Sequence, residues 1–547
     1  MIDSINILDT TIIIVYLVVV LVAGIMAAGR KKMSSSNYFL AGRGLNWVLV
    51  GAALFASNIS TIHLVGLAAS GYNEGLVWGN FEWLAAITLI MLGLVFAPFY
   101  FKSKISTLPE FLEKRYGPES RSVLAFIAIL GALFVHIGMS LYAGAVVFET
   151  FFGIDVMVSI LIISLITTIY TVLGGLKAVV VTETIQTGIL IAGALMLTII
   201  GLHALPENGI STLADLKAQL KPGQLNMLHT RETLSQLGES GNESGLTWYA
   251  CLLGYPILGL WYWCSDQTIV QRVLGAKSLK DAKLGPVFAG FLKILPVFLL
   301  VFPGVIAYVL FKDVIGTNAN QALPIMITNL LPAGLKGIMA ATLLAALMST
   351  IAAALNSCGT LVAVDIVKRI KPETSDSSQV RIGRISAVIV MILAIVWSTQ
   401  GDKFSSIFEA INKIASAIAP PVAVVFLFGV FSKRGSRKAA FITLISGLLM
   451  GITAFCFDFA PLSGYMYITK GLGIPFMMQA WWLFVICTII YFIVSYLTES
   501  PSVEIIKEYT WDNPLAVIIK EPFSGISDAR IWAALLILTL VVLYIIF

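Results

Sequence analysis

Long apolar runs recur along almost the whole chain, and most of them are long enough to cross a lipid bilayer. A spanning helix needs about 20 mainly apolar residues, because the hydrocarbon core is about 30 Å thick. About fourteen runs approach this length, at residues 10–28, 45–72, 75–101, 122–152, 156–173, 178–202, 248–270, 286–311, 337–367, 385–397, 407–431, 439–459, 481–497 and 531–547. Only 12% of the 547 residues are charged, whereas soluble domains carry about 25%. The pattern predicts an all-α integral membrane protein.

Basic residues gather in alternate loops between these runs, and the intervening loops hold few. The rich loops carry Arg30, Lys31, Lys32 and Arg43; Lys102, Lys104, Lys114, Arg115 and Arg121; Arg272, Lys277, Lys280 and Lys283; Lys368, Arg369, Lys371, Arg381 and Arg384; and Lys433, Arg434, Arg437 and Lys438. Because cytoplasmic loops carry the positive excess, we expect a multi-pass protein of the cell membrane with both termini extracytoplasmic. The small net charge of +5 gives no reason to expect a nucleic-acid partner.

Several ionisable residues fall within the apolar runs, where a charge is costly and therefore indicates function. Glu82 and Lys293 lie well inside their runs and are the strongest candidates. The other members of this set are His136, Glu149, Glu183, Asp266, Glu409 and Lys413. For His136, Glu149, Glu409 and Lys413 we favour a residue that lies near a helix end and is snorkelling or paired. The five cysteines show no metal-ligand or disulfide spacing, so we expect no cofactor. A transporter is favoured, with a channel or a membrane enzyme as the alternative.

Two of the runs contain residues that can interrupt a membrane helix. The second run is polar at its middle, over residues 56–63, where the bilayer is driest. Either a polar stripe joins neighbouring helices there, or the helix is discontinuous and its freed carbonyls can hold a cation. The seventh run carries Gly254, Pro256 and Gly259. Broken spans at this spacing are typical of secondary transporters built from two repeats of opposite topology.

Stretches of sequence spread almost end to end resemble the sodium/solute symporter family, and within it the sodium–glucose cotransporters. They are residues 38–43, 56–63, 81–83, 107–111, 170–175, 182–186, 261–272, 291–293 and 347–356. The resemblance implies a leucine-transporter-like core of two inverted five-helix repeats with broken helices. It implies an N-terminal flanking helix and loop (1–44), a first repeat (45–202), an external loop (203–246), a second repeat (247–431) and three C-terminal flanking helices (432–547).

The resemblance also implies which residues bind solutes. Sodium, the coupling ion, would lie between the second and ninth runs, at the carbonyls of Ala56, Ile59 and Ala346 and the hydroxyls of Ser349 and Thr350. Carbonyl and hydroxyl oxygens suit such a hard cation. The implied sugar contacts are Asn58, His63, Glu82, Tyr262, Trp263 and Lys293, with Phe81 and Phe408 closing the outer side and Tyr262 closing the inner side.

Three positions limit what the resemblance implies about the substrate and the ions. Asn412 stands where the family has a sugar-contacting glutamine, and Gly259 supplies no side chain where sugar carriers have a polar residue. Glu183 stands where some relatives use an aspartate for an additional cation, so a second sodium ion and a structural role are both open. We expect a symporter, not an enzyme, that couples inward sodium flow to uptake of a small neutral sugar, a hexose such as glucose or galactose. The alternative substrate is an inositol or another small neutral non-sugar solute.

Overall fold

The computed structural model describes residues 6–29, 34–399, 407–514, 516–519 and 522–547. Within these residues the chain is helical, and one isolated bridge between Leu45 and Ala276 is the only strand-like pairing. The all-α character predicted from the apolar runs is therefore confirmed.

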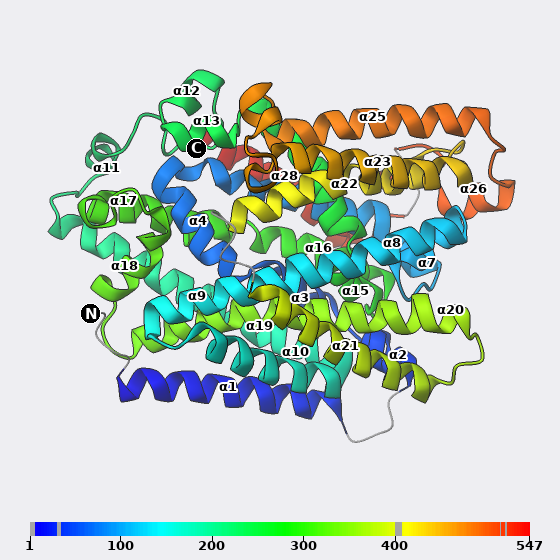
Figure 1. Cartoon of the computed structure of the whole chain (residues 1–547), viewed down its shortest axis with the longest axis horizontal. Coiled ribbons are helices and arrows are strands. Elements are labelled where there is room, and N and C mark those ends of the chain that lie inside the picture. The colour runs from blue at the N-terminus through cyan, green and yellow to red at the C-terminus, as the bar shows by residue number, and fades with distance from the viewer. Residues whose placement is uncertain (1–5, 30–33, 400–406, 515, 520–521) are drawn as a thin grey trace.

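Helical segments fill all the predicted apolar runs and make up most of the molecule (Figure 1). The elements that form the main helices, in chain order, are α1 (Ile7–Ala28), α3 (Trp47–Asn58), α4 (Thr61–Glu74), α5 (Asn80–Met91), η3 (Leu92–Phe96), α6 (Ala97–Lys102), α8 (Pro118–Gly131), η4 (Ala132–Met139), α9 (Ser140–Phe152), α10 (Val156–Glu207), α14 (Trp248–Gly259), η5 (Leu260–Ser265), α15 (Gln267–Leu274), α16 (Leu279–Leu292), η6 (Val297–Val301), α17 (Phe302–Ile315), α19 (Leu335–Leu361), η8 (Val362–Val367), α21 (Asp376–Ser398), α22 (Ile407–Phe431), α23 (Arg437–Asp458), α25 (Phe476–Leu497) and α28 (Ala529–Ile546). Short connecting elements include α2 (Ser35–Leu40), η2 (Gly75–Gly79), α7 (Leu108–Arg115), α11 (Leu213–Gln219), α12 (Arg231–Ser235), α13 (Glu239–Ser244), α18 (Ala322–Leu330), α20 (Lys368–Ile370), α24 (Ala460–Ser463), η10 (Tyr467–Gly471), α26 (Val503–Tyr509) and α27 (Ala516–Ile519).

Eleven helices in the described residues are long and apolar enough to span a bilayer. This number differs from the roughly fourteen runs of the sequence because some runs join and others split. The two runs at 156–173 and 178–202 both lie in α10, which consists of two helices that meet at a kink, because Gly175 between them is not helical (φ 58°, ψ −153°). A side chain at this positive φ is strained, and its Cβ would lie 2.3 Å from the carbonyl oxygen of Tyr38. The count of about fourteen spans stays a prediction, as do the domain boundaries.

The spanning helices run mostly along the long axis of the molecule, and the start of α1 and the C-terminus lie at the same end of it (Figure 1). That end also carries α11, α12, α13 and α18. The carbonyl of Phe547 accepts a hydrogen bond from the backbone nitrogen of Met227 at 2.7 Å, which ties the last helix to the connection between α11 and α12. Elements next to the basic loops, including α2, α7 and α20, lie at the opposite end. The loops rich in basic residues and the loops poor in them therefore lie at opposite ends of the bundle, as their alternation along the sequence predicts.

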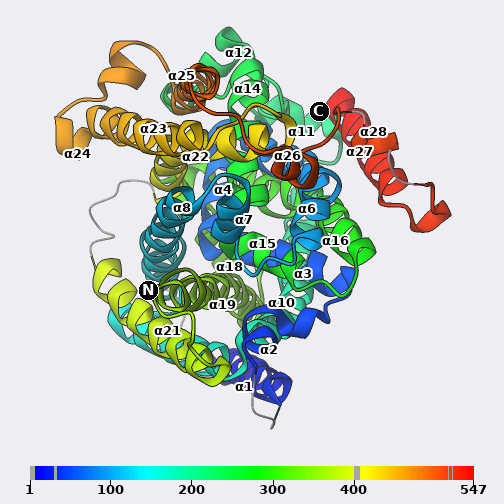
Figure 2. The same ribbon diagram turned by 90° about the vertical axis from the view of Figure 1, so that its right-hand side faces the viewer.

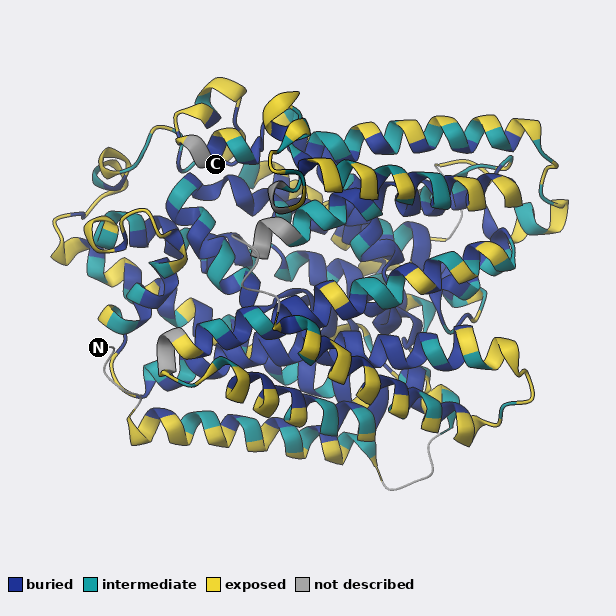
Figure 3. Ribbon diagram, in the orientation of Figure 1, coloured by how far each residue is buried: buried dark blue, intermediate teal, exposed yellow. Residues whose placement is uncertain are grey.

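Burial separates an inner group of helices from an outer group. In the most apolar part of α19, 94% of the residues are buried, compared with 17% in α1 and 22% in α25 and α28. Along the bundle axis, α3 and α15 lie inside, whereas α1, α21, α23 and α28 lie at the periphery (Figure 2). Exposed residues form stripes along the outer helices (Figure 3), and many are large and apolar, such as Ile14 and Leu538. Outward-facing apolar side chains are what a lipid environment requires.

Candidate substrate and sodium sites

The second predicted run is a broken helix at the centre of the bundle. The helix α3 ends at Asn58 and α4 begins at Thr61, with Ile59 (φ −78°, ψ 105°) and Ser60 (φ −103°, ψ 171°) extended between them. The hydroxyl of Ser60 lies 2.9 Å from Nδ1 of His63, which organises the start of α4. Helix ends leave backbone groups without intrahelical partners. The discontinuous helix predicted here is confirmed, in place of a continuous helix with a polar stripe.

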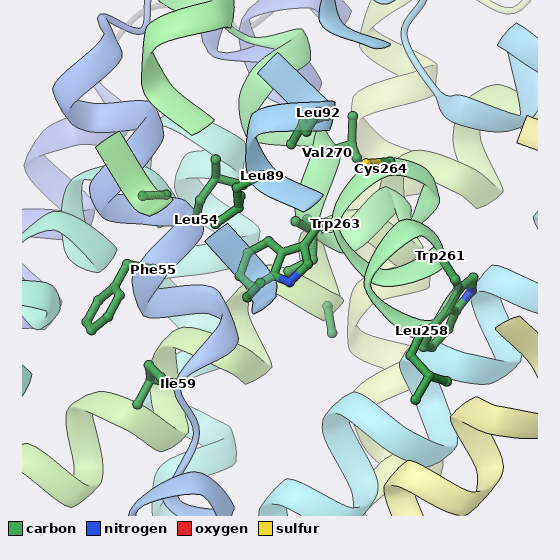
Figure 4. Close-up of a cluster of buried hydrophobic side chains, with 14 of the residues drawn as sticks. Leu54, Phe55, Ile59, Leu89, Leu92, Leu258, Trp261, Trp263, Cys264 and Val270 are labelled. Atoms are coloured by element: carbon green, nitrogen blue, oxygen red, sulfur yellow. The ribbon is translucent and has the colours of Figure 1, made fainter. Parts of the chain in front are cut away.

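The seventh predicted run is broken as well. The helix α14 passes into the π-helix η5, and Asp266 (φ −82°, ψ 125°) separates η5 from α15. Oδ1 of Asp266 accepts a hydrogen bond from the backbone nitrogen of Thr268 at 2.6 Å, so this carboxylate caps α15. Short π-helices often occur at functional sites. Within η5, Trp261 and Trp263 point in different directions (Figure 4), and both line the same cavity.

A cavity of about 130 Å³ lies beside the two breaks. A buried water needs about 10–15 Å³ of such volume, so the cavity has the size of one small solute rather than of a single ion. Residues that the resemblance implied as sugar contacts line it together: Asn58, His63, Phe81, Glu82, Tyr262, Trp263, Lys293 and Asn412. Phe408 falls in the first turn of α22, but its side chain lies outside the described residues. The structure thus brings together every implied sugar contact whose side chain it describes.

A buried cluster of one acid, one base and one amide forms part of the cavity wall. Nζ of Lys293 makes an ion pair with Oε2 of Glu82 and lies 2.5 Å from Oδ1 of Asn58. Both charged side chains are almost fully buried, at 1% and 3% exposure. An isolated charge at this depth is costly, but a paired and hydrogen-bonded one is tolerated. The cluster is neutral overall and offers directed donors and acceptors, which suits a neutral polyhydroxylated solute better than an ion.

The opposite part of the cavity carries a second polar pair that sequence reasoning did not include in the site. Nε2 of His136 lies 3.2 Å from Oδ2 of Asp266, and its ring centroid is 5.9 Å from that of Tyr262. The sequence favours a residue near a helix end, snorkelling or paired, for His136, and the structure shows the pairing. No spacing in the sequence points to the cavity, because His136 lies in the π-helix η4, which shifts the face on which a side chain lies. His136 and Asp266 both line the cavity.

The implied sodium ligands converge between α3 and α19. Oγ of Ser349 donates to the carbonyl oxygen of Ala56 at 2.8 Å, and Oγ1 of Thr350 donates to that of Ser57 at 3.2 Å. Both hydroxyls also lie within 3.2 Å of the carbonyl oxygen of Ala346. Ile59, the remaining implied ligand, forms the break itself. The set consists of uncharged oxygens, which is the chemistry that a hard monovalent cation requires.

Glu183 is bound on both carboxylate oxygens. Arg272 approaches Oε1 through Nη2 at 2.5 Å and Oε2 through Nε at 3.3 Å. The hydroxyl of Ser57 adds a hydrogen bond to Oε1 at 2.9 Å. Both charged side chains are fully buried. This geometry favours the structural role that the sequence left open, and a second sodium ion at Glu183 stays a prediction.

Two broken spans beside a buried polar cavity define the class of protein as a secondary transporter. In agreement with this, the fold is similar to that of a sodium-coupled sialic acid symporter solved in a substrate-bound outward-open state. The TM-score is 0.78, with 22% identity, covering 91% of this chain and 99% of that one. The transporter MHP1 of the nucleobase-cation-symport-1 family is similar at a TM-score of 0.53 and 14% identity, covering 86% of this chain and 97% of that one.

Sequence comparison gives relatives at higher identity. Sodium/glucose cotransporter 1 of Oryctolagus cuniculus is 34% identical, with 84% of this chain and 74% of that protein aligned. Sodium/glucose cotransporter 2 of Rattus norvegicus is 37% identical over 77% and 67% of the two chains. Sodium/myo-inositol cotransporter 2 of Homo sapiens is 34% identical over 88% and 75%.

The model of the sodium:solute symporter family matches residues 38–447. The chain belongs to this family. It is therefore a multi-pass membrane transporter and not an enzyme. The predicted fold class, an all-α membrane protein with a leucine-transporter-like core and broken helices, is confirmed by these likenesses.

Proposed function

We propose that the protein is a symporter of the cell membrane that couples inward sodium flow to uptake of a small neutral sugar, a hexose such as glucose or galactose. The observation that carries the proposal is the neutral cluster of Glu82, Lys293 and Asn58 in a cavity that adjoins uncharged oxygens from α3 and α19. The glucose cotransporters among the relatives support a hexose. An inositol or another neutral non-sugar solute is the alternative, supported by the myo-inositol relative.

In this proposal the sugar hydroxyls engage the cluster and the residues around it. Glu82 accepts hydrogen bonds from adjacent hydroxyls, while Lys293 and Asn58 donate. His63 can donate or accept, depending on its tautomer. The ring of Tyr262 covers the sugar on the inner side, and Phe81 covers it on the outer side. Asn412 adds one amide from α22. The ring of Trp263 stabilises the ammonium group of Lys293, whose Nζ lies 5.6 Å from the ring centroid.

Sodium would bind where the hydroxyls of α19 meet the carbonyls of α3. A cation placed among these oxygens replaces the hydrogen bonds from Ser349 and Thr350 and orders the break in the second span. Asn58 is the last residue of α3, so ordering of the break also positions this amide in the sugar cavity. Sodium and sugar therefore share a coupling free energy, and each raises the affinity of the other by the same factor.

Alternating access follows from the same contacts. With sodium and sugar bound, the outer side closes and the core rocks inward. Sodium leaves into a cytoplasm of low sodium concentration, the break loosens, and the sugar departs past Tyr262. In this proposal the end of the bundle that carries the basic loops faces the cytoplasm, as such loops do in membrane proteins, and both termini are extracytoplasmic. The arrangement of the loops in Figure 1 supports this orientation.

Equilibrium binding to purified protein tests the proposal. Labelled glucose, galactose and myo-inositol are each measured in sodium and in potassium, with unlabelled sugar as competitor. We expect saturable binding of one hexose that is at least about fivefold tighter in sodium, since coupling between two sites is typically about 1–3 kcal/mol. Binding of myo-inositol alone supports the alternative substrate. Equal affinities in sodium and potassium contradict the coupling.

A further inference from the structure

Three buried carboxamide side chains lie at the contact between α15 and α19, and each has a polar atom without a hydrogen-bond partner among the described residues. These atoms are Nε2 of Gln267, Oε1 of Gln271, and both Oδ1 and Nδ2 of Asn356. The three side chains are 0–4% exposed. Oγ of the neighbouring Ser357 is buried and unpartnered as well. The contact therefore offers hydrogen-bond donors and acceptors to a group that belongs to neither α15 nor α19.

The free-energy cost of burying polar atoms without hydrogen-bond partners indicates that these atoms bind a partner. A buried amide without partners is destabilising, and native structures contain few. A serine or threonine hydroxyl can turn back to its own helix, but the oxygen of Asn356 has no donor there. Gln271 shows that the contact is organised, because its Nε2 donates to Oγ1 of Thr360 at 2.7 Å and to the carbonyl of Phe39 at 2.8 Å. Water molecules, or a cation that carries its water shell, can supply hydrogen-bond partners for these groups.

The contact continues from the implied sodium ligands toward the end with the basic loops. Ser349, Asn356 and Thr360 are separated by seven and four residues, so they share one face of α19. With a rise of 1.5 Å per residue, Asn356 lies about 10 Å beyond Ser349 along the helix. On the facing helix, Gln267 directly follows Asp266, which lines the sugar cavity. A row of polar side chains thus leads from the two binding sites into the contact.

The first turn of α7 lies over this row, where Leu108 contacts Gln267 of α15 and Thr107, which precedes α7, contacts Asp365 of η8. The backbone nitrogen of Leu108 donates to Oε1 of Gln267 at 2.8 Å. Oγ1 of Thr107 donates to Oδ1 of Asp365 at 2.9 Å, and Nε of Arg121 makes an ion pair with the same oxygen at 2.7 Å, whereas Oδ2 of this buried carboxylate has no partner among the described residues. Opening of the contact between α15 and α19 must break the hydrogen bond from Leu108 to Gln267. It would then expose Oδ2 of Asp365, whose charge Arg121 already balances, as an acceptor for the water shell of the ion.

We propose that sodium is released to the cytoplasm between α15 and α19, with the carboxamides of Gln267, Gln271 and Asn356 holding its water shell and the first turn of α7 closing the route. This inference rests on the sodium coupling proposed above. Glu183 is the competing route. Its two oxygens are already bound by Arg272 and Ser57, whereas the oxygens of Gln271 and Asn356 are open.

Thiol accessibility tests the hydrated contact without any substrate. Asn356→Cys is introduced into a variant whose five native cysteines are replaced, and a membrane-impermeant maleimide is applied from the side of α7 and α20. We expect labelling in potassium and labelling about tenfold slower in sodium, which favours the closed state. Leu355→Cys, at a fully buried apolar position on the same turn, is the matched control and stays unlabelled. Labelling of Asn356→Cys in neither ion, or equally in both, overturns the proposal.

Asn356→Leu tests the route by transport. This variant keeps the size of the side chain but removes its polar atoms. Net sugar uptake into sodium-free vesicles should fall about tenfold, because it requires sodium release. Sugar exchange with equal sodium on both sides should stay within about twofold of wild type. Cys358→Ala on the same helix is the control. A proportional loss of both activities, or no loss of either, overturns the route. If wild-type uptake is equal in potassium, the proposed function itself fails, which is a separate outcome.

Discussion

The ion pair between Lys293 and Glu82 gives the most quantitative prediction of the structure. Lys293→Met removes the positive charge and leaves the Glu82 carboxylate, 3% exposed, without its partner. Removal of one partner of a buried pair costs about 3–5 kcal/mol. We therefore expect a large loss of thermal stability in detergent and loss of sugar binding. The pair Lys114–Glu110 supplies a matched control, because it is partly exposed at 35% and 22%. Lys114→Met should cost at most about 1 kcal/mol.

A double variant separates the structural part of this effect from the sugar-binding part. In Glu82→Gln with Lys293→Met no buried charge is left unpaired, so most of the lost stability should return. Sugar binding should not return, since the ammonium donor is absent and a neutral amide oxygen replaces the charged acceptor. The assays are the melting temperature of purified protein and equilibrium binding of labelled sugar. A double variant as unstable as Lys293→Met, or a double variant that binds sugar like wild type, refutes the reasoning.

Three further predictions follow from single contacts. Ser349→Ala removes the hydroxyl that meets the carbonyl of Ala56, and should raise the sodium concentration for half-maximal uptake by on the order of tenfold; an unchanged sodium dependence places the ion elsewhere. Asn412→Ala should raise the KM for sugar roughly two- to tenfold, as expected for one lost neutral hydrogen bond; an unchanged KM removes Asn412 from the site. Gly175→Ala should lower the melting temperature, because its φ is positive and its Cβ meets a backbone oxygen, while Gly188→Ala, with open space around it, should not; equal melting of the two contradicts the strained bend.

The sequence predicted the elements and the breaks because these depend on local composition. A polar segment at the middle of an apolar run has few stable arrangements in a membrane, and residues 56–63 form such a segment. The depth of Glu82 and Lys293 within their runs could likewise be read locally. Their pairing could not, since 211 residues separate them. The same holds for Arg272 and Glu183, and only the packed structure shows that this acid is already bound.

His136 shows what local reasoning could not place. A lone histidine in an apolar run has no partner that the sequence can name, so the sequence leaves a helix end, snorkelling and pairing all open. The structure places it in the cavity wall through the π-helix η4 and pairs it with Asp266 from a distant run. A π-helix shifts the helix face on which a side chain lies, and its position is not encoded in a hydrophobic period.

The central claim is that a sodium gradient drives accumulation of a sugar. Its most direct test is uptake of labelled glucose and galactose into proteoliposomes under an inward sodium gradient, repeated with potassium in place of sodium. The account predicts accumulation of one of these sugars above its equilibrium level in sodium, and only equilibration or none in potassium. Equal uptake in both ions would contradict the sodium site and the coupling built on it.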